Sequence, residues 1–474
     1  MQPREKVVLI DLPTFPKGIL ALSLINVAGC LAPLFDIEII DLNFAHLDTI
    51  RVPAEVKFVG LKVSSQNIES AKSVTGKLKQ ENSSRTVFWG GELPTLLPEE
   101  CLKYADTIVS GLFEPVASEF IADLRNNALK RKYYGANDGH MHLIPPPHFE
   151  LVSNLDSYYS FMGLPMETSR GCTEKCAFCM VHVMQKKNYY TRDIHTLQKI
   201  AARYNNHFVN IVDYNFGVDK QHVIKVAGIL KNSGVRGWMA EMCIEFLEDD
   251  ELLTALKDSG CRIVYCGLES IEDSALATVH KMNTNHVNNY ERIIRKAQSY
   301  GIQIGAGIIV GMENMNKSTF DNLYNYFSNL GLIYAKLTFL TYNPGTKVYE
   351  YMKKKGNYTT DDISKYDGNH FSYAPRGINT REVYDGVENF ITRFYSFTNI
   401  IRRSFNTKME WRRRCEFVLF NLCYRKTYMK WMEYDIFNSE EGFEKMLNTP
   451  MEKKWGIKFY EKLLHTLRKP VCQL

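Results

Sequence analysis

The sequence has no apolar stretch long enough to cross a membrane. A membrane-spanning helix takes about 20 consecutive, mostly apolar residues. The longest apolar runs here, such as GAGIIVGM at residues 305–312, are far shorter and look like buried strands. The beginning, MQPREKVVLIDLP, is a short polar leader that runs into a strand-like stretch, unlike a secretory signal peptide. We therefore expect no membrane span and a cytoplasmic location.

A strong charge imbalance, low-complexity segments and solenoid repeats are also missing. The net charge is only +5 over 474 residues, and 45% hydrophobic with 23% charged residues is ordinary for a globular protein. The positive excess lies from Ile401 onward, where acidic residues interrupt short basic runs. This pattern favours a solvated helical face over an aromatic core, so no nucleic-acid partner is expected. The chain has more residues than one hydrophobic core ordinarily supports, which predicts two or three domains.

The eleven cysteines do not suggest a disulfide framework, because disulfides are rare in cytoplasmic proteins. Eight are scattered and are expected to act as small buried apolar side chains. These are Cys30, Cys101, Cys243, Cys261, Cys266, Cys415, Cys423 and Cys472. The other three stand close together in RGCTEKCAFC at residues 170–179 and call for a different explanation.

Strand-like and helix-like segments alternate along most of the chain, which predicts parallel sheets with ligands at the carboxyl ends of the strands. Residues 1–130 form a first α/β domain, in which Asn67 is the expected N-cap of a helix over 67–82. Residues 131–165, rich in proline and glycine, resemble a linker. Residues 166–345 repeat βα units and predict a barrel or part of one. Residues 346–474 are helical and aromatic, as expected of a cap.

The clustered cysteines have the spacing C-x3-C-x2-C, at Cys172, Cys176 and Cys179. Three thiolates on one loop can hold a metal cluster, but they cannot complete a four-ligand site. Either a further ligand completes it, as His182 would in a structural zinc site, or one metal position stays open. An open iron of a [4Fe–4S] cluster is what the reductive cleavage of S-adenosylmethionine (SAM) requires.

The segment ETSRGCTEKCAFC resembles the signature of the radical SAM superfamily. The resemblance implies that the three cysteines hold a [4Fe–4S] cluster and that Phe178 lies beside the SAM adenine. VDYNFGVD (212–219) is similar to the acidic motif near the SAM amino group, which implies a role for Asp213. The stretch 247–270 resembles a segment of the superfamily whose last two residues contact SAM, which implies this role for Glu269 and Ser270. GIIVGM (307–312) resembles the glycine strand beside the adenine and includes Gly311.

The first domain extends the resemblance, because residues 87–115 look like part of the cobalamin-binding domain that precedes the barrel in a large subfamily. The subfamily implies an α/β fold: an N-terminal Rossmann-like parallel sheet of the cobalamin-binding type, a radical SAM partial (β/α)6 barrel and a mostly helical C-terminal region. Residues expected at the cobalamin crevice follow the strands of the first domain. They are Ser64, Ser65, Gly90, Gly91, Gly111 and Glu114.

One departure concerns the lower cobalamin ligand. Mutase-type domains carry D-x-H-x-x-G after the first strand, whereas this chain reads DLPTFP at 11–16. Asp11 is kept, but Pro13 replaces the histidine and Pro16 the glycine. Histidine-on binding is therefore excluded at this site. Cobalamin binding without a histidine ligand and an empty scaffold are both compatible with the sequence, and we expect cobalamin.

The resemblance implies a radical SAM enzyme that cleaves SAM to a 5′-deoxyadenosyl radical and uses cobalamin to methylate an unactivated carbon. The alternative is a cobalamin-independent oxidation, cyclisation or rearrangement, with the first domain as a scaffold. A non-catalytic metalloprotein is a further alternative, although Asp213, Glu269 and Ser270 argue against it. Expected partners are an organic substrate and a reductant such as flavodoxin or ferredoxin. Tyr366, His370 and Arg376 are candidates for the substrate cavity.

Overall fold

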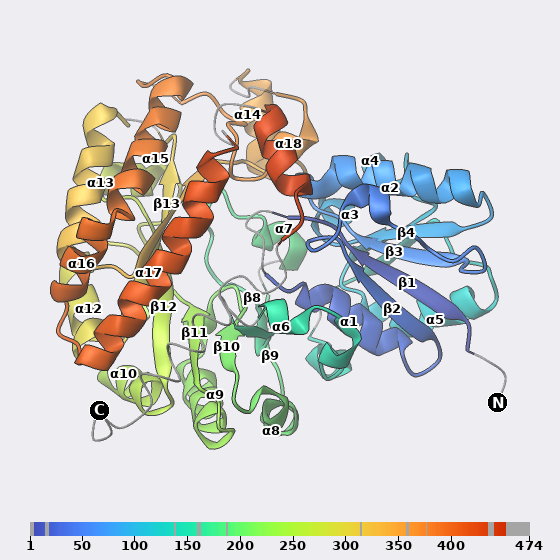
Figure 1. Ribbon diagram of the computed structural model, residues 1–474, viewed down its shortest axis with the longest axis horizontal. Coiled ribbons are helices and arrows are strands. Elements are labelled where there is room, and N and C mark those ends of the chain that lie inside the picture. The colour runs from blue at the N-terminus through green and yellow to red at the C-terminus, as the bar shows by residue number, and fades with distance from the viewer. Residues whose placement is uncertain are drawn as a thin grey trace.

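The fold is described from a computed structural model of the chain. It describes residues 4–14, 19–136, 139–158, 163–185, 188–312, 315–356, 360–375, 377–434 and 440–451. Two parallel sheets lie side by side, with the N-terminal sheet in blue and the barrel in green and yellow (Figure 1). Most of the C-terminal helices lie along the barrel on the side away from the first domain, and others lie near the junction of the two domains (Figure 1).

The first sheet is fully parallel, with the strand order β2-β1-β3-β4-β5-β6. Its strands are β1 Lys6–Asp11, β2 Asp36–Asp41, β3 Phe58–Lys62, β4 Thr86–Gly90, β5 Thr107–Gly111 and β6 Lys132–Gly135. Its helices are α1 Leu22–Leu31, α2 Ile68–Glu81, α3 Glu92–Leu96, α4 Pro98–Cys101 and α5 Ala117–Arg125. Helices α2 to α4 lie on one face of the sheet, and α1 and α5 lie on the other (Figure 1). This arrangement confirms the Rossmann-like parallel sheet.

Of two local predictions in this domain, the linker is corrected and the N-cap position of Asn67 is confirmed. Residues 131–165 are not wholly a linker, because β6 continues the sheet beside β5, with Val109 paired to Tyr133. The strand is short and lies at the edge, so only Tyr133 and Gly135 are buried and no long apolar run marks it. Asn67 occupies the N-cap position of α2 but does not cap it with its side chain. Its Oδ1 instead accepts a hydrogen bond from the backbone N–H of Ser64 at 2.8 Å.

The second sheet is the predicted partial barrel. Its six parallel strands follow the chain in the order β7-β10-β11-β12-β13-β14. They are β7 Leu164–Met166, β10 Phe208–Ile211, β11 Gly237–Glu241, β12 Cys261–Glu269, β13 Gln303–Val310 and β14 Tyr334–Phe339. The accompanying helices are α8 Ile194–Ala201, α9 Lys220–Asn232, α10 Asp250–Asp258, α11 Asp273–Thr278, α12 Val287–Ser299 and α13 Lys317–Leu330. Strand β13 is buried along its whole length, as expected of a central parallel strand.

A small antiparallel ladder brackets the cysteine loop. Strand β8 (Ser169–Gly171) pairs with β9 (Tyr189–Thr191), and the loop between them carries the cysteines and α7 (Val181–Gln185). Gly171 is essential to this closure, since its φ is +96° and a Cβ there would lie 1.7 Å from the carbonyl oxygen of Asn188. No apolar periodicity marks either three-residue strand, so the sequence did not predict them.

The C-terminal region is helical in its described part, as predicted. The helices are α14 Lys347–Lys354, α15 Thr380–Phe394, α16 Phe397–Phe405, α17 Trp411–Met432 and α18 Glu440–Asn448. Tyr395 anchors them to the barrel, because its hydroxyl bonds to both the N–H and the carbonyl oxygen of Ala335. The chain then returns to the first domain, where the N–H of Met451 donates to the Asn43 carbonyl at 2.7 Å. Among the described helices, none combines the length and apolarity that a membrane crossing requires.

Candidate functional site

The carboxyl ends of both sheets face one cavity of about 740 Å³. The first domain contributes the segment Lys62–Gln66 after β3 and the start of α1. The barrel contributes residues from the ends of β10 to β14, and the cysteine loop contributes Phe178 to Val181. Parallel sheets collect ligand-binding groups at the carboxyl ends of their strands. A cavity shared by both ends is therefore the candidate site.

The three cysteines lie together on the loop beside this cavity. The loop is docked to the barrel by the N–H of Ala177, which donates to the Val279 carbonyl at 3.0 Å. Burial raises the pKa of all three thiols, that of Cys179 to about 12, and the charges of Cys172 and Cys176 add to that rise. The thiols are thus near enough to influence one another, and metal binding would have to displace their protons.

Three thiols are suitable ligands for a metal cluster. Their side chains do not have the arrangement that they would take around a bound metal. Among the described residues, no three His, Cys, Asp or Glu side chains are arranged as a formed metal site. Three loop thiols suit an iron–sulfur cluster with one open position. The zinc alternative rests on His182, whose side chain lies outside the part of the chain that the structure describes.

Phe178 and two neighbouring barrel strands form part of the cavity wall. Phe178 packs against the cluster that contains Ile309 and lines the cavity. A Cβ at Gly307 would lie 2.3 Å from the Tyr265 hydroxyl, and one at Gly267 would lie 2.3 Å from Glu269 Oε1. The two glycines therefore let the side chains of Tyr265 and Glu269 pack close against the backbone of this wall. The place of Phe178 beside an adenine stays a prediction.

Glu269 stands at the end of β12 in a strained conformation. Its φ is +62°, and the register between β12 and β13 shifts beside it. Backbone strain of this kind collects at functional sites. The Glu269 carboxylate lines the cavity and lies 3.9 Å from Lys281 Nζ. Burial alone would lower the pKa of Lys281, but Glu269 and the neighbouring thiols outweigh it and raise that pKa, so Lys281 is a buried cation.

Three other predicted SAM residues have partners within the protein. Asp213, only 2% exposed, accepts hydrogen bonds from the Thr168 N–H, the Thr168 hydroxyl and the Ser169 hydroxyl at 2.6–2.7 Å. It thereby fixes the entry to the cysteine loop. The Ser270 hydroxyl accepts from the Glu272 N–H. Gly311 has a φ of +85°, and its N–H donates to the sulfur of Met315. Contacts of these residues with SAM stay predictions.

On the side of the first domain, the serines after β3 line the cavity as predicted. Ser65 is 1% exposed, and its hydroxyl has no hydrogen-bond partner among the residues that the structure describes, as expected where a ligand completes the contacts. Glu114 differs, because both of its carboxylate oxygens bind the Arg170 guanidinium, at 2.8 and 3.1 Å. It joins the first domain to the strand just before Cys172 and does not line the cavity.

The predicted glycines divide into two kinds. Gly91 (φ +112°) and Gly111 (φ +85°) are required by the protein's own backbone, because a Cβ would lie 2.9 Å from the Val63 oxygen or 2.1 Å from the Gly135 oxygen. At Gly90 the nearest neighbour of a Cβ is the Val109 Cβ, at 4.0 Å. Only Gly90 therefore leaves open space at the end of its strand.

We expect Gly111→Ala to lower the free energy of unfolding by about 1–3 kcal/mol, because alanine is strained at this φ and its Cβ clashes with Gly135. Gly90→Ala is the matched control and should stay within about 0.5 kcal/mol of the wild type. Urea unfolding followed by circular dichroism measures both. Equal losses in the two variants would contradict the distinction between these glycines.

The segment that carries the lower cobalamin ligand in mutase-type domains is described here as far as residue 14. Asp11 ends β1, and burial raises its pKa to about 7. Asn43 Nδ2 donates to Asp11 Oδ2 at 3.4 Å and to Asp41 Oδ1 at 3.1 Å. Pro13 stands just beyond β1, where it offers no ligand atom to a metal, and Pro16 lies outside the described residues. Asp11 is thus part of a buried polar network of the protein itself.

The sequence did not predict the polar side chains on the cavity walls. Glu92 and Glu241 come from opposite sides, and burial raises the pKa of each to about 7. Tyr265 lies between Glu241 and the glycines of β13 in the sheet. Its ring stacks on that of Tyr334, with 5.4 Å between the ring centroids. Glu92 follows β4 and Glu241 ends β11, which was the available signal, whereas Tyr265 lies within β12. The sequence does not show which strands are neighbours, so this signal could not predict that these side chains lie in one cavity.

Glu241 gives a pH-dependent prediction. Its pKa of about 7 in the folded chain lies above its ordinary value of 4.5, so the unfolded chain releases this proton first as the pH rises. The unfolding free energy of the wild type, relative to Glu241→Gln, should therefore fall between about pH 4.5 and 7. Denaturant unfolding at a series of pH values measures the difference. A constant difference would contradict a raised pKa for this carboxylate, whose side chain is exposed toward the cavity.

The candidate substrate residues have three different outcomes. Tyr366 lines the cavity as predicted, and its hydroxyl donates to the Thr360 carbonyl at 2.7 Å. His370 is not among the lining residues, and its Nδ1 lies 3.1 Å from Asp367 Oδ1. Arg376 lies outside the described residues.

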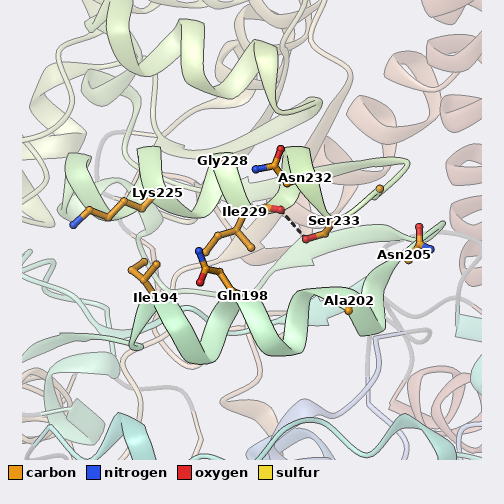
Figure 2. A pocket seen from close by; sticks show the side chains of 10 residues that line it. Ile194, Gln198, Ala202, Asn205, Lys225, Gly228, Ile229, Asn232 and Ser233 are labelled. Carbon is orange, nitrogen blue, oxygen red and sulfur yellow. Dashed lines mark hydrogen bonds between the residues drawn. The ribbon is translucent and has the colours of Figure 1, made fainter.

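A second hollow lies on the outside of the barrel, between α8 and α9 (Figure 2). Side chains such as Gln198, Lys225 and Asn232 border it, and Ser233 Oγ donates to the Ile229 carbonyl at 2.7 Å. It contains none of the predicted site residues. The cavity between the two domains therefore remains the candidate site.

Comparison with known proteins agrees with this geometry. Residues 166–327 match the family model of the radical SAM superfamily. The bacteriochlorophyllide d C-12(1)-methyltransferase of Chlorobaculum tepidum is 24% identical over 404 residues, which cover 82% of this chain and 86% of that protein. The C-8(2)-methyltransferase of the same organism is 25% identical over 352 residues, covering 71% and 77%.

A solved structure shares the whole architecture. It is that of the cobalamin-dependent S-adenosylmethionine radical enzyme OxsB with aqua-cobalamin and SAM bound. It superimposes with a TM-score of 0.64 at 13% identity and covers 98% of this chain and 80% of that chain. At this identity the likeness concerns the fold, which includes the N-terminal sheet. The predicted resemblance is confirmed for the barrel: residues 166–327 form a domain of the radical SAM superfamily, and the parallel sheet that precedes it has the fold expected of the first domain.

Proposed function

We propose that this chain cleaves SAM reductively at a [4Fe–4S] cluster held by Cys172, Cys176 and Cys179, and that it methylates an unactivated carbon of an organic substrate with the help of cobalamin. When bound, the reduced cluster supplies the electron that breaks a sulfur–carbon bond of SAM, and cobalamin supplies the methyl group. The protein's part is to hold these groups in order and to exclude water.

The observation that carries the proposal is the single cavity between the two sheets. The cysteine loop, including Phe178 and Cys179, borders it from the barrel, and Ser64 and Ser65 border it from the first domain. Removal of a hydrogen atom by a SAM-derived radical and delivery of methyl by cobalamin require both groups to reach the same substrate carbon. A site that joins the two domains meets this requirement.

Residues on each wall have distinct tasks in this proposal. Glu269, turned toward the cavity by its positive φ, is placed for the amino or ribose groups of SAM. Gly267 and Gly307 let Glu269 and Tyr265 pack close against the backbone of the cavity wall. The Ser65 hydroxyl, which has no partner among the described residues, is placed for the cobalamin side. Tyr265 and Glu241 then remain for the substrate.

The partners follow from the same chemistry. One-electron reduction of the cluster requires a donor, for which we propose a cytoplasmic flavodoxin or ferredoxin. The relatives named above are methyltransferases of bacteriochlorophyllide d. For this chain we propose an organic substrate without assigning it to that class.

The test is SAM cleavage by the reduced protein. Anaerobic protein with cluster, given SAM and dithionite or reduced flavodoxin, should release 5′-deoxyadenosine, and the Glu269→Gln variant should release markedly less. Protein that holds a full cluster but leaves SAM intact would contradict the proposed function. Cleavage by protein that does not bind added hydroxocobalamin would favour an oxidation, cyclisation or rearrangement over methylation.

A further inference from the structure

The side-chain amide of Asn215 lies between two cysteine sulfurs. Asn215 follows β10, is 2% exposed and has no access to bulk water. Its Nδ2 lies 3.2 Å from the sulfur of Cys243 and 3.9 Å from that of Cys172. Cys172 belongs to the loop motif, whereas Cys243 comes from the segment after β11. One amide nitrogen therefore faces a proposed cluster ligand and a cysteine that is not part of the motif.

The orientation of this amide is determined by the backbone. The N–H of Cys243 donates to Asn215 Oδ1 at 3.2 Å. A backbone N–H requires an acceptor, so the oxygen must face it and the NH₂ group must face the sulfurs. The NH₂ group has two hydrogens, one for each sulfur. The direction of donation to Cys172 is thus built into the fold.

A hydrogen bond to a cluster thiolate affects the cluster's electron affinity. Reduction adds negative charge to the cluster and its sulfurs, and donors to the sulfurs stabilise that charge. Partners behind the metal ligands orient them and tune the metal in the same way. We propose that Asn215 is a positioning residue that donates to the Cys172 thiolate and raises the reduction potential of the [4Fe–4S] cluster. This proposal rests on the cluster assigned under the proposed function.

Cys243 has a supporting place in this arrangement. It anchors the Asn215 oxygen through its backbone and accepts the second amide hydrogen through its sulfur. Burial raises the pKa of its thiol to about 12, so it is a neutral acceptor. The proposal assigns the cluster only the three motif cysteines, and Cys243 orients the amide without binding iron.

The test compares two Asn215 variants by redox titration of the reconstituted protein, followed by electron paramagnetic resonance. Asn215→Asp keeps the acceptor for the Cys243 N–H and replaces the donor by a carboxylate, whereas Asn215→Leu removes both at similar size. Both variants should hold about four irons per chain. Both should be reduced less readily than the wild type, at least tenfold in the reduction equilibrium or about 59 mV for one electron. The shift should be larger for the aspartate.

Cys243→Ala separates the two roles of the cysteines. Its backbone N–H still orients Asn215, so iron content and potential should stay close to those of the wild type. Unchanged potentials in both Asn215 variants with full iron content would overturn the proposal and leave the proposed function intact. Loss of iron in Cys243→Ala would also overturn it, because Cys243 would then be a ligand. A wild type that takes up no iron would refute the proposed function together with this inference.

Discussion

Cys176→Ala protein, reconstituted without oxygen, should lose its [4Fe–4S] cluster and with it all SAM cleavage. Cys176 is the middle ligand of the motif, and two remaining thiols cannot hold a cluster that already has one open position. We expect nearly complete loss of iron, from about four atoms per chain to a trace, while bound cobalt is kept. Iron and cobalt analysis, together with the absorbance spectrum, measures it.

The matched control is Cys101→Ala. Cys101 is also buried, but it lies in the core of the first domain. Its replacement should leave iron content and SAM cleavage unchanged. Equal iron in Cys176→Ala and in the wild type would show that the motif does not hold the metal.

Removal of the Arg170 side chain is expected to have the largest effect on stability. Arg170 is buried and makes four hydrogen bonds, two to Glu114 and two to Glu167. Burial would raise the pKa of Glu114, but the charge and hydrogen bonds of Arg170 outweigh it and lower that pKa. Arg170→Met leaves buried carboxylates without a partner, so it should cost about 3–5 kcal/mol of unfolding free energy.

A double-mutant cycle isolates the contact between the domains. Arg170→Met combined with Glu114→Leu replaces the pair by apolar groups and should recover part of the loss. Denaturant unfolding of the four proteins gives the coupling. Because Glu114 has a lowered pKa, its contribution is present above about pH 4.5 and is lost as the pH falls. Additive effects of the two substitutions would contradict a direct ion pair.

Most strands of both sheets could be predicted because long parallel strands are apolar and rich in β-branched residues, whereas β6 and the three-residue β7 were not assigned. Strand β13, buried at every position, is the clearest case. The edge strand β6 and the β8–β9 ladder were missed, because strands of three or four residues carry too little pattern. Gly171, which closes that ladder, has no signal in a single sequence beyond being a glycine.

The cluster ligands could be predicted because their chemistry lies in one short loop. The rest of the site depends on which strand ends are neighbours, and this comes only from the fold. Glu114 was assigned to the cofactor from its position after β5, yet Arg170 takes both of its oxygens. Asn215 and Cys243 are 28 residues apart in the chain and meet only through the pairing of β10 with β11.

The most direct measurement is the metal content of the wild-type protein after anaerobic reconstitution with iron, sulfide and hydroxocobalamin. The proposed function predicts about four irons and about one cobalt per chain, with the broad absorbance of an iron–sulfur cluster. Iron without cobalt would contradict the methylation and keep SAM cleavage. Zinc without iron would contradict the assignment of Cys172, Cys176 and Cys179 as the ligands of a radical SAM cluster.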